Sequence, residues 1–184
     1  VRSGMKVYID AGSTTEQVIH ILCKRIKMHT LTNLTLVTPS VNHADVISAC
    51  CVNMGFDDDS SAVHLYLPGG YVRPSTQAIV PFSNEHNDFE ELPKKLGGYD
   101  LAIIGANGIS EAAGLTTHAN TEIQGKLLAY NNAKQRVMVC DDSKVNIVLD
   151  YRIASFDDDF VLISNKNPVL EEMQTRYGNK IVLV

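Results

Sequence analysis

The stretch Val7–Gln17, VYIDAGSTTEQ, decides the fold. An apolar run ends at Asp10, and residues 11–15 then turn into a helical pattern, which predicts a strand, a tight turn and a helix N-terminus. Gly12 permits positive φ and lets a ligand approach the backbone closely. Hydroxyls beside the unpaired N–H groups of the first helical turn belong to Ser13, Thr14 and Thr15. Such a turn favours a bound anion, phosphate above all, although an ordinary Ser or Thr cap explains the same residues.

The composition is that of one soluble globular domain. The chain has 184 residues, a formal charge of −5 and 45% hydrophobic residues, with a pI near 5.6. This charge argues against a nucleic-acid-binding surface, because clustered Lys and Arg hold phosphate backbones. The longest apolar stretches are strand-sized and no secretory signal is recognisable, so we expect a cytoplasmic protein without a membrane span. We expect reduced thiols in the core at Cys23, Cys50, Cys51 and Cys140. A redox role for the adjacent Cys50 and Cys51 is the alternative.

Strand-like and helix-like segments alternate over the whole chain. This alternation predicts an α/β domain with three layers, a mostly parallel sheet carrying helices on both faces. Ligands bind such sheets at the carboxyl ends of the strands. The polar segments that follow predicted strands are DAGSTT, TPS, PGG, GANG and DDSK. We therefore expect these loops to gather along one edge of the sheet.

The middle of the chain is less regular. Short β segments are predicted at Tyr71–Pro74 and Ala78–Pro81. The stretch Phe82–Leu96 predicts a short helix that Pro93 interrupts, because proline removes a helical hydrogen bond. Residues 55–61 predict an exposed acidic turn, a solvated loop rather than a metal site, since adjacent Asp residues rarely converge on one ion. A further helix begins at Asn120, with apolar positions at Ile123, Leu127, Leu128 and Ala133.

In order along the chain, DAGSTT, LTLVTPS, LPGGYVRP, DLAIIGANGI, GLTT and VCDDSK resemble the motifs of the DeoR-family sensor domain. The resemblance runs from about Val7 to Lys144. It implies a fold similar to ribose-5-phosphate isomerase and the coenzyme A transferases. It also implies that residues 1–184 are the effector-binding domain of a bacterial repressor, whose effector is a phosphorylated sugar or related metabolite. A winged helix-turn-helix preceding Val1 would then make all DNA contacts, and the protein would be a homodimer or homotetramer without cofactor or metal.

The resemblance also implies which residues bind the effector. Those expected at the phosphate are Asp10, Gly12, Ser13, Thr14 and Thr15, with Thr38 and Ser40 beside them. The turn that matches the GGxxR motif contains Gly69, Gly70 and Arg73. The sugar would be lined by Gly105, Ala106, Asn107 and Gly108. The remaining matches are Thr116, Thr117, Glu122, Lys126, Asp141 and Lys144. Two alternatives stay open: Arg73 pairs with a local carboxylate, and Glu122 and Lys126 form a surface i,i+4 ion pair.

The chain departs from the family pattern at three places. Pro39 stands where Asn is usual and removes an amide, Val145 replaces a usual Phe, and His118 lies where an acidic residue is commoner. A histidine at the ligand edge would give binding a pH dependence, although a local hydrogen-bonding role explains it equally. The effector is therefore not assumed to be a typical one.

An isomerase of the same superfamily is the rival interpretation. Aldose–ketose isomerisation needs a base that moves a proton between adjacent carbons. Ribose-5-phosphate isomerases carry a DGAD loop with two carboxylates, and the corresponding positions here are Ile104 and Asn107. Neither side chain serves as a base, so the sequence predicts binding without turnover and no catalytic residue.

Overall fold

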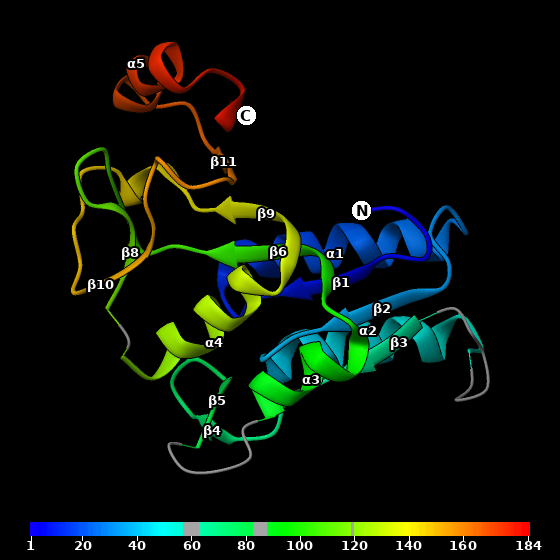
Figure 1. Cartoon of the computed structure of the whole chain (residues 1–184). Coiled ribbons are helices and arrows are strands. Elements are labelled where there is room, and N and C mark those ends of the chain that lie inside the picture. Colours follow the sequence, from blue (N-terminus) through cyan, green and yellow to red (C-terminus); the bar gives the residue numbers. More distant parts are fainter. Residues whose placement is uncertain (57–62, 83–87, 119) are drawn as a thin grey trace.

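A seven-stranded parallel sheet forms the centre of the computed structural model (Figure 1), which describes residues 1–56, 63–82, 88–118 and 120–184. Across the sheet the strands are β12 (Ile181–Leu183), β11 (Val161–Ser164), β9 (Ala133–Val139), β6 (Tyr99–Gly105), β1 (Lys6–Ile9), β2 (Leu34–Val37) and β3 (Val63–Tyr66). The chain adds β2 and β3 on one side of β1 and the later strands on the other. The order therefore reverses between β1 and β6, where parallel sheets open a crevice at their carboxyl ends.

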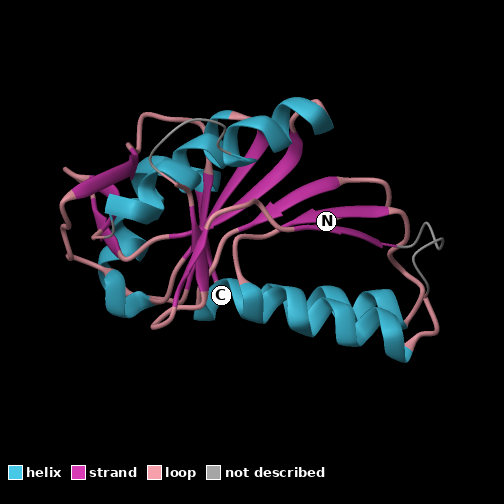
Figure 2. Ribbon diagram, turned by 90° about the horizontal axis from the view of Figure 1, so that it is seen from below, coloured by secondary structure: helices cyan, strands magenta, loops and turns pink. Residues whose placement is uncertain are grey.

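Helices cover both faces of the sheet (Figure 2), as predicted. Val7 and Ile9 of β1 belong to a buried cluster shared with α1 (Ser13–Lys27) and α2 (Val41–Asn53). Tyr8 between them belongs to a second cluster that contains residues of α4 (Asn120–Asn131) and α5 (Pro168–Tyr177). α3 (Asp88–Leu96) packs on this second face. Successive side chains of a strand point to opposite faces, so a continuously apolar strand is buried on both sides.

Two small antiparallel units extend the carboxyl edge. The predicted β segments form the hairpin of β4 (Tyr71–Arg73) and β5 (Ala78–Val80). The sequence did not predict the three-stranded sheet of β7 (Gly108–Ser110), β8 (Gly114–Thr117) and β10 (Tyr151–Ala154). Gly114 has φ 79°, and a Cβ there would lie 2.1 Å from the Ala154 carbonyl oxygen. This position therefore requires glycine where β8 meets β10.

Two predicted helix boundaries were wrong. α3 is not interrupted at Pro93, because the proline lies inside the helix with its ring buried. Ala133 is not helical, since α4 ends at Asn131 and Ala133 pairs with Tyr99 as the first residue of β9. One residue separates that helix from β9, so apolar spacing alone could not locate the boundary.

All four cysteines are free, and Cys23, Cys50 and Cys140 are buried. The aspartates of the predicted acidic turn lie outside the described residues. Within the described part of the chain, no helix has the length and apolar character needed to cross a membrane.

Candidate functional site

A cavity of about 260 Å³ opens at the carboxyl edge of the sheet, beside the crevice between β1 and β6. The loops after β1, β6 and β9 line it, together with the β4–β5 hairpin and α4. The DAGSTT, GANG and DDSK loops therefore converge as predicted. The lining residues are Ala11, Gly12, Ser13, Thr14, Thr15, Arg73, Thr76, Ala78, Gly105, Ala106, Asn107, His118, Glu122, Lys126, Val139, Asp141 and Lys144.

The N-terminus of α1 faces this cavity with its backbone amides. Gly12 is the N-cap residue, at φ 151° and ψ 160°, and no side chain caps the helix. Its carbonyl oxygen accepts hydrogen bonds from the Thr15 hydroxyl and the Glu16 amide, both at 2.9 Å. Because Glu16 makes the first intrahelical bond, the amides of residues 13–15 have no partner in the helix. The ordinary Ser or Thr cap is thus absent at this turn, and the amides and the helix dipole favour an anion.

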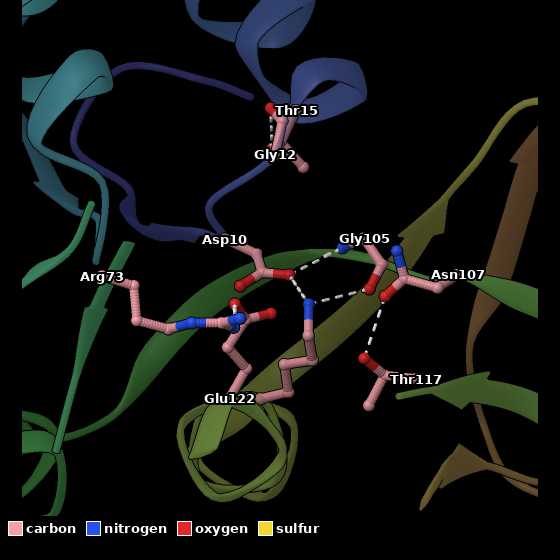
Figure 3. A network of polar contacts seen from close by, with 9 residues as sticks. Asp10, Gly12, Thr15, Arg73, Gly105, Asn107, Thr117 and Glu122 are labelled. Atoms are coloured by element: carbon pink, nitrogen blue, oxygen red, sulfur yellow. Dashed lines mark hydrogen bonds and ion pairs between the residues drawn. The ribbon is translucent and has the colours of Figure 1, made fainter. Parts of the chain in front are cut away.

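Asp10 and Lys126 form a buried ion pair. Figure 3 shows the Asp10 carboxylate beside Gly105, at the ends of β1 and β6. Asp10 is 4% exposed and Lys126 3%. The Lys126 ammonium also donates to the Gly105 carbonyl oxygen at 3.0 Å, and the Gly105 amide donates to Asp10 Oδ2 at 3.0 Å. This closed set of contacts fixes the end of β1 to the end of β6. The Asp10 carboxylate is engaged here and does not line the cavity.

A second ion pair, between Arg73 and Glu122, forms part of the cavity wall. Their side chains are 30% and 21% exposed. The pair joins the β4–β5 hairpin to the first turn of α4. The local-carboxylate alternative for Arg73 is therefore what this structure contains. The i,i+4 alternative for Glu122 and Lys126 is wrong, because each pairs with a distant residue instead.

Asn107 is the polar side chain of the GANG loop at the cavity. Its Oδ1 accepts a 2.9 Å hydrogen bond from the Thr117 hydroxyl, and its backbone amide donates to the Thr116 carbonyl oxygen, also at 2.9 Å. Ile104 is fully buried in the core. Gly108 lies behind the wall, where a Cβ would come within 2.5 Å of the Ile147 carbonyl oxygen. Gly108, Thr116 and Thr117 thus support the loop without lining the cavity.

The DDSK loop adds one acidic and one basic side chain. Asp141 is the N-cap of the short 3-10 helix η1 (Asp142–Lys144) and accepts a 2.9 Å hydrogen bond from the Ser143 amide. Hydrogen bonding from Ser143 lowers the pKa of Asp141. The Lys144 ammonium lies 4.0 Å from Asp141 Oδ2, and both side chains are partly exposed. This pair is therefore loose.

Thr38 and Ser40 lie outside the wall and hold a histidine that the sequence reasoning missed. Ser40 caps α2 by accepting from the His43 amide at 3.2 Å, and the Thr38 hydroxyl lies 3.2 Å from His43 Nδ1. His43 is 1% exposed. Burial lowers its pKa, and a hydrogen bond with the backbone of Gly12 partly offsets this effect. His43 therefore supports the DAGSTT loop at Gly12. A histidine three residues after a helix-capping serine was the available signal.

The glycines of the GGxxR motif also lie outside the cavity wall. The Gly69 amide donates to Asp88 Oδ2 at 3.2 Å. A Cβ on Gly70 would come within 2.2 Å of the Val80 carbonyl oxygen, so the hairpin that carries Arg73 requires glycine there. Lining residues absent from the predicted set are Ala11, Thr76, Ala78, His118 and Val139. Thr76 and Ala78 follow Arg73 in the hairpin, which was the signal that could have indicated them.

No metal site is recognisable in the described residues, where no group of three or more His, Cys, Asp and Glu side chains could hold an ion. The cavity wall consists of amides, hydroxyls and charged side chains. The wall is therefore polar and carries charges of both signs.

Comparisons with known proteins agree on one family. Residues 1–166 match the family model described as DeoR C terminal sensor domain. The HTH-type transcriptional repressor GlcR of Bacillus subtilis is 26% identical over 91% of this chain and 56% of its own length. The uncharacterized HTH-type transcriptional regulator FruR of the same organism is 27% identical over 78% of this chain and 48% of its own. The chain thus spans about half the length of the curated relatives it matches.

The fold is also that of an enzyme family. A D-ribose-5-phosphate isomerase solved in complex with phospho-erythronic acid superposes with a TM-score of 0.53 at 12% identity. The match covers 79% of this chain and 48% of the isomerase. The predicted similarity of fold is confirmed. At this identity the likeness establishes the architecture alone.

Proposed function

Because the chain belongs to the DeoR C terminal sensor domain family, we propose that its cavity binds a phosphorylated sugar or a related phosphometabolite. The observation that carries the proposal is the uncapped N-terminus of α1, which presents amides of residues 13–15 to the cavity. Anions bind at such helix ends through N–H groups and the positive end of the helix dipole. The hydroxyls of Ser13 and Thr14 add donors of the same kind.

The other side of the cavity suits a polyhydroxylated ligand. Asn107, His118 and Thr76 contribute hydrogen-bonding groups, and Glu122 and Asp141 contribute carboxylates. Sugars are recognised by a few polar side chains that match individual hydroxyl groups. The phosphate would therefore lie at α1, on the side of the cavity toward Arg73, and the carbon chain would extend toward Asn107 and His118. The phospho-erythronic acid of the isomerase neighbour is a ligand of the same general class.

We propose binding without turnover, and isomerisation is the alternative. Ile104, directly before the GANG loop, is fully buried and apolar. Asn107 carries an amide that already accepts from Thr117. Neither group abstracts a proton from carbon. Glu122 is the carboxylate on which a residual reaction would depend. Loss of any turnover in Glu122→Gln would identify such a reaction.

Residues 1–184 would act as the sensor domain of a longer repressor. The matched relatives are HTH-type regulators, and this segment carries a net charge of −5. A winged helix-turn-helix elsewhere in the polypeptide would therefore bind DNA. A ligand changes such a protein only through its differential affinity for two conformations. We infer that the whole protein is a homodimer or homotetramer in the cytoplasm. Helix-turn-helix proteins bind paired half-sites as dimers.

The test is a thermal-shift screen of phosphorylated sugars against the same sugars without phosphate. A ligand that binds only the folded state raises the melting temperature in a concentration-dependent way. We expect shifts from the phosphorylated members alone, and no aldose–ketose interconversion with any of them. Equal shifts from unphosphorylated sugars, or no shift from any compound, would contradict the assignment. Appreciable turnover that Glu122→Gln abolishes would favour the isomerase.

A further inference from the structure

The cations of the cavity wall all face carboxylates already. Arg73 pairs with Glu122, Lys126 pairs with Asp10, and Lys144 lies 4.0 Å from Asp141. These are the Lys and Arg side chains that line the cavity. A phosphate brings between one and a half and two negative charges at neutral pH. A phosphate held by the amides of α1 gains a direct contact with one of these cations only if that cation leaves its present partner.

The second and third of these pairs differ most in the energy that is needed to separate the two charges. Lys126 and Asp10 have side chains that are 4% and 6% exposed. Separating them would leave an unpaired charge in the interior, which is strongly unfavourable. Lys144 and Asp141 are 34% and 43% exposed and stand at the limit of an ion pair. Their mutual attraction is small, so Lys144 can turn to a ligand at little cost.

The Arg73–Glu122 pair lies between these extremes. It is a direct contact with side chains 30% and 21% exposed, so the attraction is appreciable and both groups still reach solvent. A guanidinium binds a phosphate through two parallel hydrogen bonds, a geometry that it also offers to a carboxylate. Glu122 and a ligand phosphate would therefore use the same donors of Arg73.

We propose that Glu122 competes with the anionic ligand for Arg73, and so sets both the affinity of the site and its preference for dianionic phosphate monoesters. The inference rests on the proposed function. A monoanion that displaces Glu122 replaces one single negative charge at Arg73 by another and leaves the glutamate unpaired. A dianion attracts the guanidinium more strongly than the carboxylate does. Only the dianion therefore gains from the exchange.

The experiment is isothermal calorimetry with inorganic phosphate and with dimethyl phosphate, a monoanion, on the chain and on Glu122→Gln. Inorganic phosphate isolates the anion contacts, because it lacks the hydroxyl groups that a sugar would offer to Glu122. In Glu122→Gln we expect phosphate to bind roughly five- to tenfold more tightly, since Arg73 is then free of a charged competitor. The ratio of affinities between the dianion and the monoanion should fall in the same variant.

Three further variants make the result specific. Glu111→Gln removes a carboxylate partner of Arg176 in an exposed pair outside the cavity and should leave both affinities unchanged. Glu122→Ala should reproduce the gain if charge rather than amide geometry is responsible. The double variant Arg73→Gln/Glu122→Gln should lose the gain, because the competition requires both residues.

The possible failures are distinguishable. If the unmodified chain binds phosphate while Glu122→Gln and Glu122→Ala bind it equally or more weakly, the competition is refuted and the anion site stands. If none of these proteins binds phosphate or a phosphorylated sugar, the proposed function fails and the competition fails with it.

Discussion

Glu122 and Lys126 stand one turn apart on α4, yet they make two different kinds of ion pair. Lys126 lies within the fold against Asp10, where both side chains are almost completely buried. Glu122 lies at the cavity against Arg73, where both side chains remain partly exposed. The buried pair joins the ends of β1 and β6, whereas the partly exposed pair joins α4 to a surface hairpin. α4 thus contributes to one ion pair that is buried in the fold and to another that a ligand can reach.

The difference in burial explains this division of roles. Breaking a buried pair is strongly unfavourable, so we expect the Asp10–Lys126 pair to persist when a ligand binds. A partly exposed charge can exchange its partner for water or for a ligand at small cost. Ligand binding is therefore expected to change the contacts of Arg73 and to leave those of Asp10 intact.

The largest expected effect comes from breaking the buried pair. Asp10→Asn leaves the Lys126 ammonium buried without a counter-charge, so the free energy of unfolding should fall by about 3–5 kcal/mol. Urea denaturation measures this loss. The control is Glu111→Gln, which removes a charged partner of Arg176 in an exposed pair, and should cost about 1 kcal/mol or less. Equal losses in the two variants would show that burial does not separate the two classes of pair.

A smaller effect on stability, but a large one on binding, is expected from the exchangeable pair. Arg73→Gln should lower the free energy of unfolding by about 1 kcal/mol or less, because the pair is partly solvated. Phosphate affinity should fall by about tenfold, the contribution of one charge-assisted contact. Denaturation and calorimetry on the same preparation measure the two quantities. If Arg73→Gln lost as much stability as Asp10→Asn, the Arg73–Glu122 pair would be required for the fold rather than available to a ligand.

The smallest expected effect concerns His43, a buried part of the framework that titrates. Burial lowers its folded pKa below the ordinary value of 6.5, so the unfolded chain binds the proton more readily. The stabilisation is therefore complete above about pH 6.5 and declines as the pH falls toward the lower folded pKa. His43→Gln should flatten this part of the stability–pH curve measured by denaturation. An unchanged slope in the variant would assign the pH dependence to other groups.

The positions of the site loops were predictable, because polar glycine-bearing segments after apolar runs have to meet at one edge of a parallel sheet. The partners of their charged residues were not. Arg73 and Glu122 are 49 residues apart, and Asp10 and Lys126 are 116 apart. Spacing on a helix favours the local i,i+4 pair, and only the folded chain brings the competing partners close. The sheet of β7, β8 and β10 escaped prediction because such short strands leave little periodicity.

The most direct test of the anion site is calorimetric titration of a phosphorylated sugar identified by the screen, with the chain and with Ser13→Asp. The substitution places a negative charge against the amides at the start of α1, where it also suits the helix dipole, so the fold should be retained. We expect the unphosphorylated sugar to bind the chain at least about a hundredfold more weakly, a difference of about 2.7 kcal/mol. Binding of the phosphorylated sugar should be undetectable in Ser13→Asp. Undiminished binding by a folded Ser13→Asp would contradict a phosphate site at α1.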